Sequence, residues 1–185
     1  MSHSALVGAQ TTGAGSDTSR QDNKGLRGVA ASHDMARTDL GRMNHYKSII
    51  IHVGNANRVD PAIIAGIISR ESRAGKALDW NGCGDHGNAF GLMQVDKRYH
   101  TPNGGWNSKT HLFHATDILT GFIEDIRSKF PGGTASEQLK GGLAAYNQGT
   151  GAVHSLSDVD ANTTGRDYSN DVIARAQWYS KYGGF

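Results

Sequence analysis

Residues 60–72 read Asp-Pro-Ala-Ile-Ile-Ala-Gly-Ile-Ile-Ser-Arg-Glu-Ser, and this stretch carries the clearest structural signal in the chain. Asp60 is a favourable N-cap, and Pro61 suits the first position of a helix. The isoleucines at 63, 64, 67 and 68 recur at helical spacing and form one apolar face. Gly75 supplies a stop signal shortly afterwards. The pattern predicts a helix that buries its apolar face in the protein core.

Helical periodicity also appears on both sides of this stretch. Apolar residues recur at helical spacing after Asp34, and a second apolar run precedes Asn57. Further along the chain, Thr134 and Glu137 form a capping-box pattern, which is typical of a helix start. We therefore expect further helices over about residues 34–46, 49–57, 115–126, 134–146 and 167–182.

A glycine-rich region interrupts the helices. Residues 76–110 contain six glycines, which predicts a looped lobe with a short strand at 91–95. Residues 1–29 lack apolar periodicity, so we expect them to form a mobile or loosely packed N-terminal segment. Residues 30–185 are then expected to form one α+β domain, mainly α, that combines a helical part with a small glycine-rich β lobe.

The composition of the 185-residue chain narrows the class of protein. Nineteen basic and seventeen acidic side chains give a net charge of +2, so we expect no nucleic-acid partner. The single cysteine, Cys83, excludes an intrachain disulfide and is expected to be a free thiol. The nine histidines include no His-x-x-x-His pair, and we expect neither a metal nor another cofactor.

The hydropathy pattern bears on where the protein acts. No stretch approaches the roughly 20 apolar residues of a membrane span. Residues 1–21 also lack the apolar core of a secretory signal. The residues alone therefore favour neither a membrane span nor conventional export.

Glu71 stands out because it follows Ile67 by four residues and so extends the apolar face of the helix over 60–72. An isolated carboxyl group in such a place tends to keep its proton, which is the property of a general acid. The alternative is an ordinary ion pair with Arg70 or Arg73 at the helix end.

Two aspartates flank the glycine-rich run that follows. Asp85 and Asp96 lie on either side of residues 86–95, where a carboxylate near water stays ionised. Carboxyl groups whose pKa values are pushed apart are the acid and base of glycosidases. The alternative for each aspartate is a turn-forming role.

Three separated motifs resemble those of goose-type lysozymes. They are Ala-Gly-Ile-Ile-Ser-Arg-Glu-Ser at 65–72, Gly-Leu-Met-Gln-Val-Asp at 91–96 and Gly-Gly-Leu-Ala-Ala-Tyr-Asn at 141–147. They occur in the family's order and spacing, and the similarity extends from about residue 28 to residue 183. The resemblance implies a lysozyme-like catalytic domain over 30–185, with a substrate cleft between the helical part and the lobe. The absence of disulfides is similar to fish members of the family.

The resemblance also implies an activity and the residues that perform it. It assigns Glu71 as the catalytic acid and Asp85 and Asp96 as the aspartates that position the attacking water. The implied reaction is inverting hydrolysis of the β-1,4 bond between N-acetylmuramic acid and N-acetylglucosamine in bacterial peptidoglycan, with chitin oligosaccharides as weaker ligands. The implied biological role is bacteriolytic innate defence by a monomer, at an extracellular or phagosomal site.

The resemblance further implies a set of sugar contacts: Gln94, Arg98, His100, Phe122, Tyr146 and Asn147. Without the resemblance, the helical spacing of Phe122 predicts a core residue, and His100 is expected to be a solvated loop residue. Tyr146 is then equally consistent with the core and with a cleft. Two alternative functions stay open. One is a lytic transglycosylase, which uses the same glutamate, and the other is a non-catalytic peptidoglycan- or chitin-binding protein.

Overall fold

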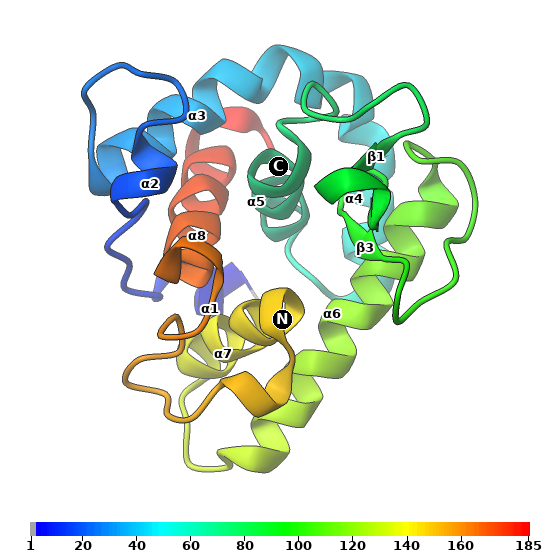
Figure 1. The fold of residues 1–185 in the computed structure, drawn as a ribbon. Coiled ribbons are helices and arrows are strands. Elements are labelled where there is room, and N and C mark those ends of the chain that lie inside the picture. The colour runs from blue at the N-terminus through cyan, green and yellow to red at the C-terminus, as the bar shows by residue number, and fades with distance from the viewer. Residues whose placement is uncertain (1–2) are drawn as a thin grey trace.

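The computed structural model describes residues 3–185, and helix α5 (Pro61–Ser72) runs through the middle of the molecule (Figure 1). The predicted start is confirmed, because the Asp60 carboxylate accepts a hydrogen bond from Ala62 N at 2.9 Å. The four isoleucines of the helix are completely buried. The predicted end of the helix at Gly75 is wrong. The helix ends at Ser72, and Arg73, in the left-handed conformation with φ 53°, is its C-cap.

The other predicted helices are also present, with shifted ends. α6 begins six residues earlier than expected, because the Ser108 hydroxyl accepts a hydrogen bond from His111 N at 3.1 Å and caps it. The capping box of α7 is confirmed, with Thr134 and Glu137 satisfying each other's backbone N–H groups. The long helices besides α5 are α3 (Gly28–Met43), α4 (Lys47–Asn57), α6 (Lys109–Lys129), α7 (Ala135–Gln148) and α8 (Tyr168–Trp178), and a π-helical turn (Tyr179–Gly183) follows α8.

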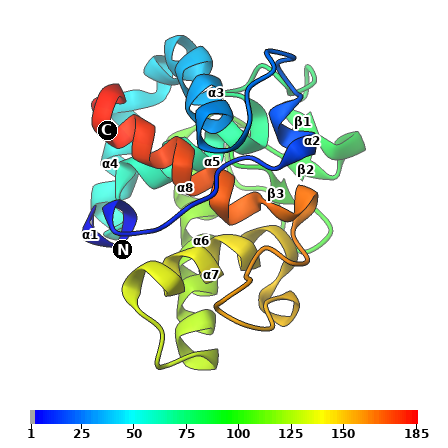
Figure 2. The ribbon, with the colours of Figure 1, turned by 90° about the vertical axis from the view of Figure 1, so that its left-hand side faces the viewer.

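Helices α5 and α8 pack against each other at very short range (Figure 2). Gly66 makes this possible: a Cβ atom built there would lie 2.8 Å from Val172 O and 3.0 Å from Ala176 Cβ. The absence of a side chain at this position therefore sets how closely the two helices approach.

Buried ion pairs connect the same two helices to α3. Arg175 of α8 is completely buried and donates to Asp171 at 3.0 Å and to the Ser69 hydroxyl of α5 at 3.0 Å. The Ser69 hydroxyl in turn donates to Asp39 of α3 at 2.7 Å, and Asp39 accepts from Arg73 at 2.9 Å. The left-handed cap residue Arg73 is thus held in place through its side chain.

The glycine-rich lobe contains a three-stranded antiparallel sheet in the order β1 (Cys83–Gly84), β2 (Ala89–Phe90) and β3 (Val95–Asp96). The mainly α class with a small β lobe is therefore confirmed. The strand predicted at 91–95 is wrong for residues 91–94, which form the turn between β2 and β3. Gly91 has φ 82° there, and a Cβ atom at this position would lie 2.4 Å from the His111 ring. Packing against α6 thus requires glycine in a turn conformation.

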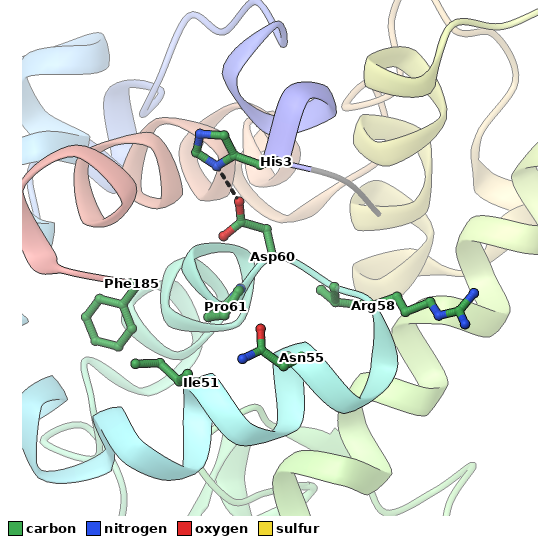
Figure 3. A pocket seen from close by; sticks show the side chains of 9 residues that line it. His3, Ile51, Asn55, Arg58, Asp60, Pro61 and Phe185 are labelled. Carbon is green, nitrogen blue, oxygen red and sulfur yellow. Dashed lines mark hydrogen bonds and ion pairs between the residues drawn. The ribbon is translucent and has the colours of Figure 1, made fainter.

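The first described residues, from His3 onward, contact the core at several points. Helix α1 (His3–Val7) buries Leu6 completely, and a second short helix, α2, spans Ser16–Ser19. His3 Nδ1 lies 2.8 Å from Asp60 Oδ2 beside a pocket of about 580 Å³ at the start of α5 (Figure 3). Residues 1 and 2 of the segment predicted at 1–29 lie outside the described residues. Its mobility in solution stays a prediction.

A Gly66→Ala substitution should destabilise the protein by about 1–2 kcal/mol, because the added methyl group overpacks the contact between α5 and α8. Gly121→Ala in α6 is the matched control, since a Cβ atom there meets nothing within 4 Å. The control should stabilise the protein by about 0.5–1 kcal/mol through helix propensity alone. Urea unfolding measures both changes, and equal stabilisation by the two variants would contradict the packing argument.

Candidate active site

The structure brings all nine residues expected from the sequence to one cleft of about 840 Å³. The cleft lies between the β lobe and the helices α5, α6 and α7, and the start of α8 also lines it. The nine expected residues in its lining are Glu71, Asp85, Gln94, Asp96, Arg98, His100, Phe122, Tyr146 and Asn147.

Glu71 occupies the last turn of α5 and is the most deeply placed carboxyl group of the cleft. Burial raises its pKa from the ordinary 4.5 to about 7, while the nearby Tyr168 hydroxyl and the Arg70 charge oppose the rise. The expected alternative of an ion pair with Arg70 or Arg73 is disfavoured by the geometry. Arg70 forms an ion pair with Asp167 at 3.0 Å. Arg73 forms ion pairs with Asp22 and Asp39. The carboxyl group of Glu71 is therefore largely protonated below neutral pH.

Asp85 and Asp96 lie in the more accessible part of the cleft, on the β lobe. Arg98 joins them, because its guanidinium donates to both carboxylate oxygens of Asp96 at 2.9 and 2.7 Å and reaches Asp85 at 3.8 Å. These hydrogen bonds hold the pKa of Asp96 below its usual range. The cleft thus contains a protonated carboxyl group and an ionised one at the same pH.

Several expected sugar contacts also hold the walls of the cleft together. The Tyr146 hydroxyl donates to Met93 O at 2.7 Å, which joins α7 to the β lobe. The Asn147 side-chain oxygen accepts from Thr164 N at 2.9 Å, and Gln94 donates to Gly91 O at 2.8 Å. The sequence left open whether Tyr146 belongs to the core or to the cleft. The structure shows both, because its half-buried side chain packs against the core and also lines the cleft.

Phe122 and His100 complete the expected set. Phe122 is half-buried on α6, where it packs against a small apolar cluster and also lines the cleft. The His100 ring lies 6.1 Å from the His114 ring in an edge contact, so it is held by a neighbour and is only partly solvated.

Other residues that the sequence did not single out also line the cleft, and three of them have side chains of interest. Tyr168, at the start of α8, is buried with its hydroxyl near Glu71. Gln21 belongs to the N-terminal segment, which was expected to be loosely packed. Tyr99 lies between two expected residues, and 80% of its surface is exposed. Exposure of an aromatic side chain is a property that the sequence pattern does not reveal.

A mainly helical fold with a small antiparallel sheet, and a cleft that combines a half-buried carboxyl group of raised pKa with two more accessible ones, define the class of lysozyme-like glycosidases. The family model for lysozyme g matches residues 5–183. Lysozyme G of Dromaius novaehollandiae is 55% identical over 94% of this chain and 84% of its own length. The lysozymes g of Epinephelus coioides (all of both chains) and Gallus gallus (94% of this chain, 82% of its own) are each 52% identical. The chain belongs to the lysozyme g, or goose-type lysozyme, family.

The protein is therefore a lysozyme, a glycoside hydrolase, and membership of the family implies that it binds peptidoglycan. Among residues 3–185, no group of three or more His, Cys, Asp or Glu side chains is arranged to hold a metal ion. Over the same part of the chain, no helix is both long and apolar enough to cross a membrane.

A Glu71→Gln substitution should change stability in a pH-dependent way. The folded protein keeps a proton on Glu71 up to about pH 7, whereas the unfolded chain loses it near the ordinary value of 4.5. Wild-type stability therefore falls as pH rises between these values, and the variant escapes this loss. Relative to wild type, the variant should gain about 3 kcal/mol between pH 4 and pH 8.

Chemical denaturation at both pH values measures this gain. Glu124→Gln is the matched control, because Glu124 is exposed on α6 and paired with Arg127. A gain of the same size and sign in the control would contradict the burial of the Glu71 charge.

Proposed function

We propose that this lysozyme hydrolyses the β-1,4 bond between N-acetylmuramic acid and N-acetylglucosamine in bacterial peptidoglycan, with inversion of configuration. One observation carries the proposal: a carboxyl group with a pKa of about 7, Glu71, lines the same cleft as Asp96, which Arg98 holds ionised. Two carboxyl groups with separated pKa values supply the acid and the base that glycoside hydrolysis requires.

In the proposed reaction, Glu71 donates its proton to the glycosidic oxygen as the bond to the anomeric carbon breaks. A water molecule attacks that carbon from the opposite face of the ring and gives its proton to Asp96 or Asp85. The products are two shorter glycan chains, and the new reducing end has the inverted configuration. Inversion needs room for the water, so the acid and the base are expected to be separated by roughly 6.5–9.5 Å.

The remaining residues of the cleft are proposed to bind the sugars. The rings of Phe122 and Tyr146 offer apolar faces, while Asn147, His100 and Gln94 offer polar groups to hydroxyl and acetamido substituents. Chitin oligosaccharides share the N-acetylglucosamine unit, so we propose them as weaker ligands. The bacteriolytic role and a monomeric state are part of the same proposal.

Product analysis tests the proposed chemistry. Mass spectrometry of purified peptidoglycan digested by wild type should show reducing muramic-acid ends, because water is the acceptor. Glu71→Gln should lower kcat at least about 100-fold, since it removes the donated proton. Anhydro-muramic ends would instead identify a lytic transglycosylase, and binding without products would identify a binding protein. Near-normal activity of the variant would overturn the assignment of Glu71.

An Arg98→Gln substitution should lower kcat roughly tenfold, because Asp96 loses the two hydrogen bonds that orient it. The pKa of Asp96 should also rise towards its ordinary value, so activity on the acid side of the kcat/KM profile should be lost at a higher pH than in wild type. The alkaline side, which follows Glu71, should stay near pH 7.

Arg127→Gln is the control for this variant, since Arg127 forms an exposed ion pair with Glu124 on α6 and does not line the cleft. A raised KM with unchanged kcat and an unchanged pH profile would show that Arg98 contacts only substrate.

A further inference from the structure

Tyr99 differs from the other aromatic residues that line the cleft. Among the described lining residues, Phe122 and Tyr146 are half-buried, and Tyr168 is 1% exposed. Tyr99 lines the same cleft with 80% of its surface exposed. Its ring therefore has free faces, whereas the other phenyl and phenol rings are partly or wholly covered by protein.

The backbone that carries Tyr99 is anchored to Asp96. Tyr99 N and His100 N both donate to Asp96 O, at 3.2 and 2.9 Å. The preceding residue, Arg98, is attached to the Asp96 carboxylate by two hydrogen bonds. Tyr99 is thus carried on a segment whose backbone is hydrogen-bonded to Asp96, three residues earlier.

Tyrosine is well suited to hold a sugar in such a position. Its ring is rigid and amphipathic, so it offers a large contact area at a small cost in conformational entropy. One face of a pyranose ring consists of C–H groups, which pack against an aromatic face while the sugar hydroxyls stay in water. An exposed ring beside a cleft that binds glycan strands has the properties of a stacking platform.

We propose that Tyr99 is a further saccharide-binding residue, whose ring stacks against a pyranose unit of the glycan strand at the outer edge of the cleft, next to Asp96. The inference rests on the proposed function, in that the bound polymer is the peptidoglycan glycan strand. It adds a contact to the substrate site and leaves the acid and base assignments unchanged.

Trp80 provides a matched comparison within the same lobe. Its side chain is even more exposed, at 91%, but Trp80 does not line the cleft. If any exposed aromatic ring of the lobe bound glycan, both Tyr99 and Trp80 would contribute to substrate affinity. If binding requires a position in the cleft, only Tyr99 contributes to it.

The test compares Tyr99→Ala, Tyr99→Phe and Trp80→Ala in steady-state kinetics on soluble peptidoglycan glycan fragments. Tyr99→Ala should raise KM about three- to tenfold, the size expected for one aromatic stacking contact, with kcat within about twofold of wild type. Tyr99→Phe keeps the ring and should behave as wild type, as should Trp80→Ala. Circular dichroism and Tm should be unchanged in all three, because both side chains are exposed.

A direct binding measurement separates the contact from turnover. In the Glu71→Gln background, adding Tyr99→Ala should weaken binding to the same fragments by the same three- to tenfold, about the worth of one stacking contact. An unchanged KM and an unchanged affinity for Tyr99→Ala would overturn the inference, as would an equal effect of Trp80→Ala. A lowered kcat shared by Tyr99→Ala and Tyr99→Phe would also overturn it, since the hydroxyl group and not the ring would then be responsible. Inactivity of wild type on these fragments would instead refute the proposed function.

Discussion

The arrangement of the cleft depends on a buried set of ion pairs around the last turn of α5. Arg70 and Arg73 flank Glu71 in the sequence, and each is neutralised by carboxylates from other helices, including Asp171 of α8 and Asp39 of α3. Because both guanidinium groups are occupied, neither pairs with Glu71, and its carboxyl group stays protonated by burial. Such networks add little to stability as a whole, but the loss of one partner leaves a buried charge uncompensated. The ion pairs of Arg70 and Arg73 therefore fix the geometry of the last turn of α5, which carries Glu71.

The two kinds of carboxyl group in the cleft owe their protonation states to different physical causes. Glu71 is shielded from water at the end of a buried helix, which disfavours its charge. Asp96 lies on a short strand near solvent, where Arg98 favours its charge. Since one cause is burial and the other is a hydrogen-bonded cation, the pKa values can move apart without either group disturbing the other. Separate parts of one fold thus hold a protonated and an ionised carboxyl group in the same cleft.

A chain with one cysteine must hold its N-terminal segment without an intrachain disulfide. Polar contacts take this role here: Asp22 accepts two hydrogen bonds from Arg73, at 2.8 and 3.0 Å, and the carboxylate of Asp167 accepts from Gly15 N at 2.7 Å. The burial of Leu6 adds an apolar contact. The same segment supplies Gln21 to the cleft wall, so its attachment to Arg73 also contributes to the shape of the site.

The sequence alone determined the helices, the capping box of α7 and the position of Glu71 on an apolar face, because these features follow from local backbone preferences and periodicity. The nine residues that line the cleft were expected together only through the resemblance to goose-type lysozymes, since the residues by themselves left Phe122, Tyr146 and His100 open to structural roles. The sequence did not predict the turn at 91–94, where Gly91 packs against the His111 ring of α6. It also did not predict the left-handed cap at Arg73, whose side chain is bound by the Asp39 carboxylate of α3. Both partners come from helices that are distant in the sequence. The partners of Arg70 and the exposure of Tyr99 were likewise decided by the tertiary structure. Contacts between residues about a hundred positions apart, such as Arg70 and Asp167, exist only once the helices have packed, and one sequence carries no local signal for them.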